Sequence, residues 1–183
     1  MLLIFTFIKP IIKLIACIFF DKKYIKGRWF EERHTGWIWI FRALWVQKIL
    51  RFNSSAPFPI NATTTVSNYD NIIFHPDDLN NMQSPGCYFQ NFKAKIIIGR
   101  NSYIGPNVGI ITANHDLYNL DNHLEGRDVI IGDKCWIGMN SVILPGVLLG
   151  ECTIIAAGSV VNVSFPEGHC LVGGMPAKVI RYL

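Results

Sequence analysis

Two histidines, His115 and His123, lie in a polar stretch between residues 110 and 132. An imidazole titrates near neutral pH, so a histidine can accept a proton from a substrate and return it under physiological conditions. A lone histidine is more often structural than catalytic. What these two side chains do therefore depends on the elements that position them.

Large apolar residues recur every six residues on both sides of this stretch. They are Ile60, Val66, Ile72, Phe92, Ile98, Ile104 and Ile110 before it, and Ile131, Ile137, Ile143, Leu149, Ile155 and Val161 after it. This spacing fits neither the 3.6-residue period of a helix nor the period of two of a strand. It is also shorter than the strand spacing of about 8–12 residues in a β-sandwich. It predicts short strands joined by turns, with three units in a coil of about 18 residues and the apolar residues stacked inside.

The corners of the predicted coils carry residues that tolerate unusual backbone angles. Glycine follows many of the apolar positions, and Asn101, Asn107 and Asn140 are placed at other corners. From Ile110 to Ile131 there are 21 residues, which is not a multiple of six. The coil is therefore expected to be interrupted by a projecting loop, residues 114–128. Loops held on a rigid scaffold are where functional side chains concentrate.

The first 52 residues differ from the rest in charge and hydropathy. They contain ten of the 17 basic and three of the 13 acidic residues, so they carry +7 while the remainder carries −3. The first 20 residues are mostly apolar, but Lys9, Pro10 and Lys13 interrupt them, which disfavours a membrane-spanning helix. The positive charges come too late, and the residues near Cys17 are too large, for a cleaved signal peptide.

Tryptophan and basic residues together favour a membrane surface as the partner of this region. Four of the five tryptophans lie in residues 1–52, beside a basic cluster that runs from Lys22 to Arg28. This combination is typical of the lipid headgroup boundary. We expect residues 1–55 to be an apolar, helical extension that contacts the membrane surface through residues 1–52. The alternative is an apolar helical hairpin that packs on its own domain or on an oligomer partner.

The segments "IIIGRNSYIGPNVGI", "VIIGDKCWIGMNSVILPGVLLGECTIIAAGSVV" and "GGMPAKVIRYL" resemble the hexapeptide-repeat acyltransferases, in particular their sugar and polysaccharide O-acetyltransferase branch. The resemblance covers roughly residues 60–183. It implies a mainly β fold, a left-handed parallel β-helix over residues 56–175, followed by a short tail, residues 176–183. It further implies a homotrimer with three active sites, each between neighbouring coils, acetyl-CoA as the acyl donor and no metal.

The resemblance also implies roles for the loop. His115, in "TANHD", matches the catalytic base that accepts the proton of an acceptor hydroxyl, and Asn114 or Asp116 would orient its imidazole. A backbone N–H near "WIG" would bind the developing oxyanion. Tyr88 and Asn91 are expected near the acceptor, and His123 is expected on the far side of the loop as a solvent-facing or acceptor-facing group.

The donor site is implied along the coils that follow. Small side chains there let the extended pantetheine arm approach the backbone, and two basic residues near the C-terminus would meet the phosphates of coenzyme A. The residues expected to bind the donor are Trp136, Gly138, Met139, Ala156, Ala157, Gly158, Ser159, Asn162, Lys178 and Arg181.

These features predict O-acetylation of a carbohydrate, with a lipid-linked sugar of a surface polysaccharide as the leading acceptor. The alternative is O- or N-acetylation of a soluble acceptor such as an amino sugar nucleotide or an antibiotic. A metal-dependent enzyme of the carbonic anhydrase type needs three convergent histidines, which the spacing does not favour. A non-enzymatic coil would not need the histidine loop, and nucleic-acid binding is disfavoured because the coil region is acidic. The absence of CxxC pairs among five cysteines indicates the cytoplasm, including the inner face of the cell membrane.

Overall fold

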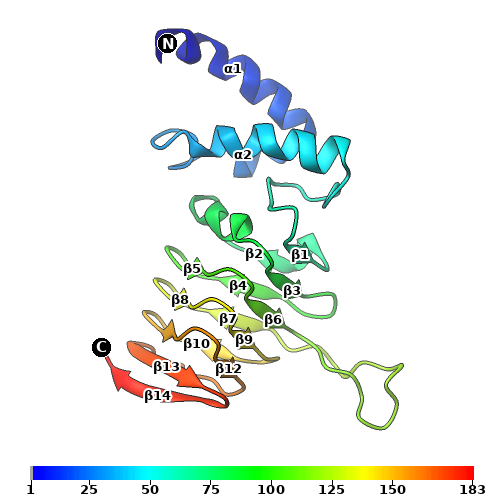
Figure 1. Cartoon of the computed structure of the whole chain (residues 1–183), viewed down its shortest axis with the longest axis vertical. Coiled ribbons are helices and arrows are strands. Elements are labelled where there is room, and N and C mark those ends of the chain that lie inside the picture. Colours follow the sequence, from blue (N-terminus) through cyan, green and yellow to red (C-terminus); the bar gives the residue numbers. More distant parts are fainter. Residues whose placement is uncertain (1) are drawn as a thin grey trace. The chain divides into compact units, whose positions relative to one another are not determined.

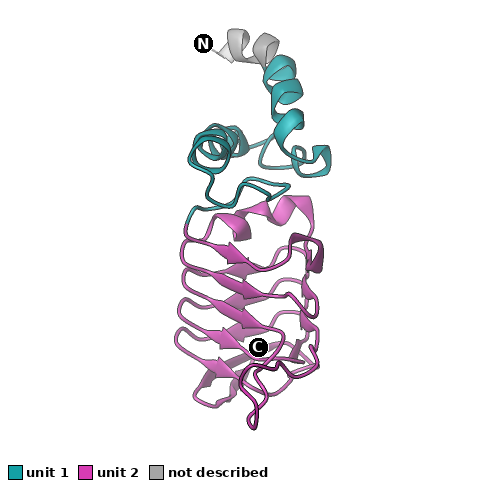
Figure 2. Cartoon of the chain, turned by 90° about the vertical axis from the view of Figure 1, so that its right-hand side faces the viewer, with its two compact units in different colours: residues 1–62 teal, residues 63–183 magenta. Residues whose placement is uncertain are grey.

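The computed structural model describes residues 2–183, and the side chains of residues 9–183. The chain forms two compact units, residues 1–62 and residues 63–183 (Figure 2). The sequence predicts a boundary after residue 55, seven residues earlier than this division. Residues 56–62 belong to the first unit because the buried side chain of Gln47 bonds with both Phe58 and Ile60.

The first unit is helical, as predicted. Its helices are α1 (Leu2–Phe19), η1 (Lys22–Tyr24), α2 (Thr35–Ala43) and η2 (Leu44–Ile49). Its interior includes an edge-to-face contact between Phe30 and Trp37, whose ring centroids lie 5.2 Å apart. Among the residues that the structure describes, no helix is both long enough and apolar enough to cross a membrane.

The second unit is a stack of coils with three sheets as its walls, whose strands are parallel except for the last one, β14 (Figure 1). Sheet A contains β1 (Thr65–Val66), β3 (Tyr88–Gln90), β6 (Gly109–Ile111), β9 (Val142–Ile143) and β12 (Val160–Val161). Sheet B contains β2 (Ile72–Ile73), β4 (Ile96–Ile98), β7 (Val129–Ile131) and β10 (Leu148–Leu149). Sheet C contains β5 (Tyr103–Ile104), β8 (Trp136–Ile137), β11 (Ile154–Ile155), β13 (Cys170–Gly174) and β14 (Ala177–Tyr182). The short helices η3 (Tyr69–Asn71) and η4 (Pro76–Gln83) interrupt the first coil.

Columns of buried apolar side chains hold the coils together. In sheet A, the register aligns Val66, Phe89, Ile110, Ile143 and Val161, and all five are buried. Burying each large aliphatic side chain contributes about 1.5–3 kcal/mol, so each added coil extends one continuous core. The predicted hexapeptide spacing therefore marks the interior of the fold.

One predicted interior position is wrong. The six-residue count places Phe92 inside, but Phe92 is 39% exposed and Phe89 occupies the column instead. The reason is that the corner between β3 and β4 is longer than one hexapeptide allows, which shifts the local register. Phe92 consequently lies outside the core, beside the projecting loop.

The corners have the backbone conformation that the asparagines suggest. Asn101, Asn107 and Asn140 have φ values of 57°, 57° and 59°, in the left-handed region that asparagine tolerates better than most residues. Two of them also bond to each other across adjacent coils, since the Asn107 Nδ2 atom donates to the Asn140 Oδ1 atom at 3.1 Å.

The coil is interrupted between β6 and β7, where a loop projects away from the stack (Figure 1). The C-terminal residues 176–183, predicted as a tail, contain strand β14, which pairs antiparallel with β13. The last coil thus ends in a hairpin that adds its final strand to sheet C.

Candidate active site

The projecting loop folds back on itself as a small two-stranded hairpin. The Asp116 N–H donates to the Asn122 carbonyl at 2.9 Å, and the Leu124 N–H donates to the Asn114 carbonyl at 2.8 Å. These two bonds enclose an antiparallel bridge between His115 and His123. The loop therefore brings together two histidines that are eight residues apart in the sequence.

The imidazole of His115 is oriented by a backbone carbonyl of its own loop. Its Nδ1 atom lies 2.7 Å from the carbonyl oxygen of Leu120. A carbonyl oxygen only accepts hydrogen bonds, so Nδ1 carries the proton and Nε2 keeps its lone pair. His115 is exposed, and its Nε2 atom is the one suited to accept a proton.

Orienting roles for the side chains of Asn114 and Asp116 stay a prediction, since the contact that the structure shows at Nδ1 is with the Leu120 carbonyl. The Asp116 Oδ1 atom accepts hydrogen bonds from the N–H groups of Tyr118 at 2.7 Å and Asn119 at 3.3 Å, which stabilises the turn at the tip of the loop. Asn114 contributes its main-chain carbonyl to the hairpin. Short polar side chains favour such local turn bonds over longer reaches.

His123 lies against His115, not on the far side of the loop as predicted. The ring centroids of the two histidines are 4.1 Å apart and their planes are inclined by 37°. Partial desolvation, and then the positive charges that His115 and Lys93 can carry, lower the pKa of His123 below its usual 6.5. These surroundings accordingly favour the uncharged form of His123.

Gln90 anchors the outgoing arm of the loop, and the sequence carries no signal that singles it out. Its Oε1 atom accepts from the N–H groups of Thr112 at 3.1 Å and Ala113 at 3.0 Å, and its Nε2 atom donates to the Ala113 carbonyl at 2.9 Å. Gln90 is buried, so these bonds are shielded from water. The direction in which the loop leaves the coil is set by this side chain.

The return arm is anchored by Lys93 and by a close approach at Gly126. The Lys93 Nζ atom donates to the carbonyls of His123 at 3.0 Å and Leu124 at 3.3 Å. A Cβ atom at Gly126 would lie 2.7 Å from the Lys93 Cβ atom, so the two backbones meet without room for a side chain. Neither residue was predicted.

The two residues predicted to lie near the acceptor, Tyr88 and Asn91, differ in exposure. Tyr88 is exposed on the outer side of sheet A, level with Gly109. Asn91 is 0% exposed; its Oδ1 atom accepts from the Asn68 N–H at 2.9 Å and its Nδ2 atom donates to the Asn68 carbonyl at 2.7 Å. Because both ends of this amide are occupied, Asn91 is a structural residue, and its predicted contact with substrate is wrong.

An apolar pocket of about 440 Å³ lies at the corners between sheet C and sheet A. It is lined by five of the residues predicted to bind the donor, Trp136, Gly138, Met139, Ala156 and Ala157, and by Gly105, Pro106, Ile154, Ile155 and Leu171. The Gly138 N–H already donates to the Ile155 carbonyl at 2.8 Å. The small residues leave the coil backbone open to an extended ligand.

The other predicted donor residues lie outside this lining. Gly158 is at the next position of the same corner. The Ser159 hydroxyl is buried and donates to the Ala156 carbonyl at 2.6 Å, so this side chain stabilises the corner. Asn162 is exposed after β12.

Lys178 and Arg181 are exposed on β14. Residues three apart on a regular strand point to opposite faces. The register between β13 and β14 slips by one residue at Leu171, which restores the two basic residues to one face.

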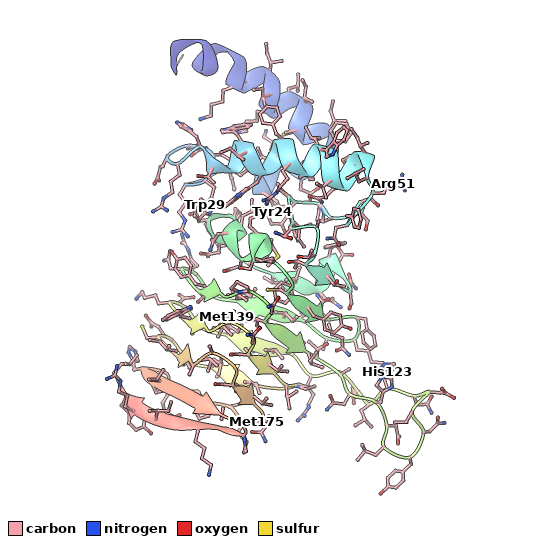
Figure 3. All side chains as sticks on the ribbon, in the orientation of Figure 1. Tyr24, Trp29, Arg51, His123, Met139 and Met175 are labelled. Atoms are coloured by element: carbon pink, nitrogen blue, oxygen red, sulfur yellow. The ribbon has the colours of Figure 1, made fainter. Side chains whose placement is uncertain are left out.

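The pocket and the histidine loop occupy different corners of one chain. The pocket follows the strands of sheet C, whereas the loop leaves sheet A after β6. Figure 3 shows the same separation, with Met139 among the coils and His123 at the projecting loop. One chain therefore does not bring His115 to the pocket that its own coils form. In the described part of the chain, no three His, Cys, Asp or Glu side chains gather as a metal site requires.

Comparison with known proteins identifies the coil. Residues 128–162 match the family described as bacterial transferase hexapeptide (six repeats). The chain is 46% identical over 92 residues to the Saccharomyces cerevisiae protein YJL218W, a candidate acetyltransferase, and this match covers 48% of the chain and 46% of that protein. It is 32% identical over 103 residues to the galactoside O-acetyltransferase of Escherichia coli, and this match covers 51% of the chain and 50% of that protein.

A solved structure gives the same result. The maltose O-acetyltransferase from Clostridium difficile 630 superposes with a TM-score of 0.50 and 38% identity, over 54% of this chain and 53% of that one. The chain spans about half the length of the curated relatives it matches. The predicted fold class, a left-handed parallel β-helix of hexapeptide repeats, and the predicted resemblance are confirmed.

Proposed function

We propose that this chain, whose coils carry the hexapeptide repeat of bacterial transferases, transfers an acetyl group from acetyl-CoA to a sugar hydroxyl. The observation that carries the proposal is the 2.7 Å contact between the His115 Nδ1 atom and the Leu120 carbonyl oxygen. That contact leaves Nε2 as an exposed proton acceptor on the loop that projects between β6 and β7.

Transfer is direct in this mechanism. The His115 Nε2 atom accepts the proton of the acceptor hydroxyl while the hydroxyl oxygen bonds to the thioester carbonyl carbon. The tetrahedral intermediate then expels the thiolate of coenzyme A, which takes the proton back from Nε2. No covalent bond to the enzyme forms, and His115 ends the cycle in the state in which it began.

The apolar pocket supports coenzyme A as the donor. Its small corner residues, Ala156 and Ala157, leave room for an extended pantetheine arm along the coils. Lys178 and Arg181, on one face of β14, are suited to the phosphates at the other end of the same molecule. Trp136 and Met139 would cover the thioester end with apolar surface.

The separation of the loop from the pocket supports a homotrimer. A complete site needs His115 beside the pocket, and a neighbouring subunit can supply the half that one chain does not place there. The loop tip presents Leu117, Tyr118 and Leu120 to solvent, and Tyr118 is 100% exposed. Apolar side chains at a loop tip are suited to burial against a partner.

The first unit supports an acceptor at a membrane. On α1, Ile11, Leu14 and Ile18 follow helical spacing on one face, and Leu14 and Ile18 are 71% and 73% exposed. Ile38, Phe41, Trp45 and Ile49 form a second exposed row on α2 and η2. With a net charge of +7 on residues 1–62, these rows are suited to an anionic lipid surface, where each basic residue adds about 1 kcal/mol. A lipid-linked sugar of a surface polysaccharide is the acceptor that this arrangement favours.

A thiol-release assay with acetyl-CoA tests the proposal. Purified full-length protein is offered galactosides, maltose, amino sugar nucleotides, an aminoglycoside and lipid-linked sugars, and free coenzyme A is measured with a thiol reagent. Turnover with a lipid-linked sugar is the expected result. Turnover confined to an amino sugar nucleotide or an antibiotic selects the soluble-acceptor alternative, and no turnover with any hydroxyl or amine contradicts both.

A further inference from the structure

The backbone of the loop places His123 where it touches His115 most closely. The two main-chain bonds that flank the pair run from Asp116 to Asn122 and from Leu124 to Asn114. In an antiparallel ladder this pattern defines a non-hydrogen-bonded pair, at which opposite side chains share a face and come closest. The 4.1 Å separation of the two ring centroids follows from that position.

His123 is itself fixed from the coil. Its ring meets Phe92 edge to face, with centroids 4.9 Å apart and planes at 83°. Its carbonyl accepts a hydrogen bond from Lys93, the residue after Phe92. Phe92, displaced from the core by the register shift, thus supports the second histidine from the scaffold side.

The His115 imidazole is consequently held from two directions. The Leu120 carbonyl fixes one ring nitrogen in the plane of the ring, and His123 covers one face of the ring. A single hydrogen bond at Nδ1 leaves the imidazole free to swing about that bond. The flat ring of His123 on one face removes this freedom, so that the Nε2 atom of His115 points in one direction.

We propose that His123 is a positioning residue, a flat ring that keeps the Nε2 atom of His115 aligned with the acceptor hydroxyl. This role rests on the proposed function of His115 as the base. It requires the ring of His123 and not its nitrogen atoms. It assigns a purpose to Phe92 and Lys93 as well, because these two residues hold that ring in place.

The lowered pKa of His123 is consistent with this role. An imidazolium at this distance would repel a proton that arrives on His115 during each turnover. Lys93 and His115 both face His123, and neither favours its charged form.

The test compares three variants of the full-length protein in the thiol-release assay: His123→Phe, His123→Ala and His115→Ala. We expect His123→Phe to keep kcat within about twofold, and His123→Ala to lower kcat by about tenfold to a hundredfold, the scale of a misplaced reacting group. The KM for acetyl-CoA should not change in either, because the pocket lies at another corner. Asn122→Ala, an exposed neighbour on the same arm, is the matched control and should behave as the unmodified protein.

The outcomes distinguish the positioning role of His123 from the role of His115 as the base, on which it rests. Unchanged kcat in His123→Ala, with His115→Ala inactive, overturns the positioning role and leaves the base intact. Equal losses in His123→Phe and His123→Ala overturn the role too, since a nitrogen atom would then be needed. A normal rate in His115→Ala overturns the proposed function itself. If His123→Ala does not fold, His123→Leu replaces it, because leucine keeps apolar volume without a flat face, and a rate equal to that of His123→Phe counts against the proposal.

Discussion

The Nδ1 atom of His115 lies 2.7 Å from the carbonyl oxygen of Leu120, five residues further along the same loop. The tautomer of His115 is thus selected by the main chain, and among the described residues no acidic side chain is seen to bond to this imidazole. A carbonyl cannot change its protonation state, so this hydrogen bond does not depend on the ionisation of its partner.

Replacing His115 by alanine should lower kcat by about 100-fold or more, the scale of a lost general base. The KM for acetyl-CoA should stay the same, since the pocket that we propose for the donor is lined by residues outside the loop. Steady-state kinetics check both values. His169→Asn is the control, because it removes an exposed imidazole outside the loop and asparagine tolerates the φ of 47° there. An unchanged kcat in His115→Ala contradicts the assignment.

Gln90→Glu should destabilise the protein and slow turnover. A carboxylate cannot donate to the Ala113 carbonyl, so a buried oxygen would face another oxygen at the 2.9 Å now bridged by a hydrogen bond. We expect the free energy of unfolding to fall by about 1–3 kcal/mol. Urea denaturation measures the loss, and the same amide-to-acid change at exposed Asn122 provides the comparison. Equal free energies of unfolding for the Gln90 and Asn122 variants would contradict the anchoring role of Gln90.

Two glycines near the loop should respond differently to alanine. At Gly126 the new Cβ atom would lie 2.7 Å from the Lys93 Cβ atom and 2.9 Å from the Lys93 carbonyl carbon. At Gly109 the nearest atoms would be the Val142 methyl groups at 3.7 Å and 3.8 Å, an ordinary contact. Gly126→Ala should cost about 1–3 kcal/mol as an overpacked site, whereas Gly109→Ala should be tolerated. The melting temperatures of the two variants, measured by thermal unfolding, test this difference. Similar melting temperatures would show that the return arm shifts to accommodate the new side chain.

Ala157→Leu should weaken donor binding without disturbing the coil. Ala157 lines the apolar pocket and is exposed, so a larger side chain would fill space that the pantetheine arm needs. We expect the KM for acetyl-CoA to rise by about tenfold, as a few misplaced methyl groups can cause. Glu167→Leu adds the same side chain at an exposed turn outside the pocket and should leave KM unchanged. An unaltered KM in Ala157→Leu would place the donor elsewhere.

Exchanging Leu14 and Ile18 for aspartate should abolish binding to lipid vesicles. Both side chains are exposed on one face of α1, and the basic unit around them favours anionic lipid. Co-sedimentation with phosphatidylglycerol vesicles should recover the unmodified protein and lose the double variant. Val163→Asp, an exposed apolar position on the coils, should bind as before. If the unmodified protein does not sediment, or if the double variant instead changes its oligomeric state, the apolar rows serve oligomer packing.

The sequence by itself determined the architecture, since that depends on periodicity. Apolar residues every six positions can be buried together only by stacking short coils, and asparagine at the corners tolerates the positive φ that those turns need. The 21-residue gap between Ile110 and Ile131 was enough to locate the loop. Five of the residues that the family resemblance implied for the donor do line one pocket, because residues at equivalent corners stack on one another.

Only the tertiary structure decided what the side chains around His115 do. Within a loop, contacts depend on how the chain turns back, and no spacing rule shows that His115 meets Leu120 and His123 and that Asp116 bonds instead within its own turn. Asn91 looked available in the sequence but is enclosed by Asn68, which lies one coil away. Phe92 moved from the core to the loop because one corner is longer than its neighbours. Periodic burial can be predicted from the spacing of residues in the sequence. The orientation of an exposed imidazole, in contrast, is set by contacts between segments that only the folded chain brings together.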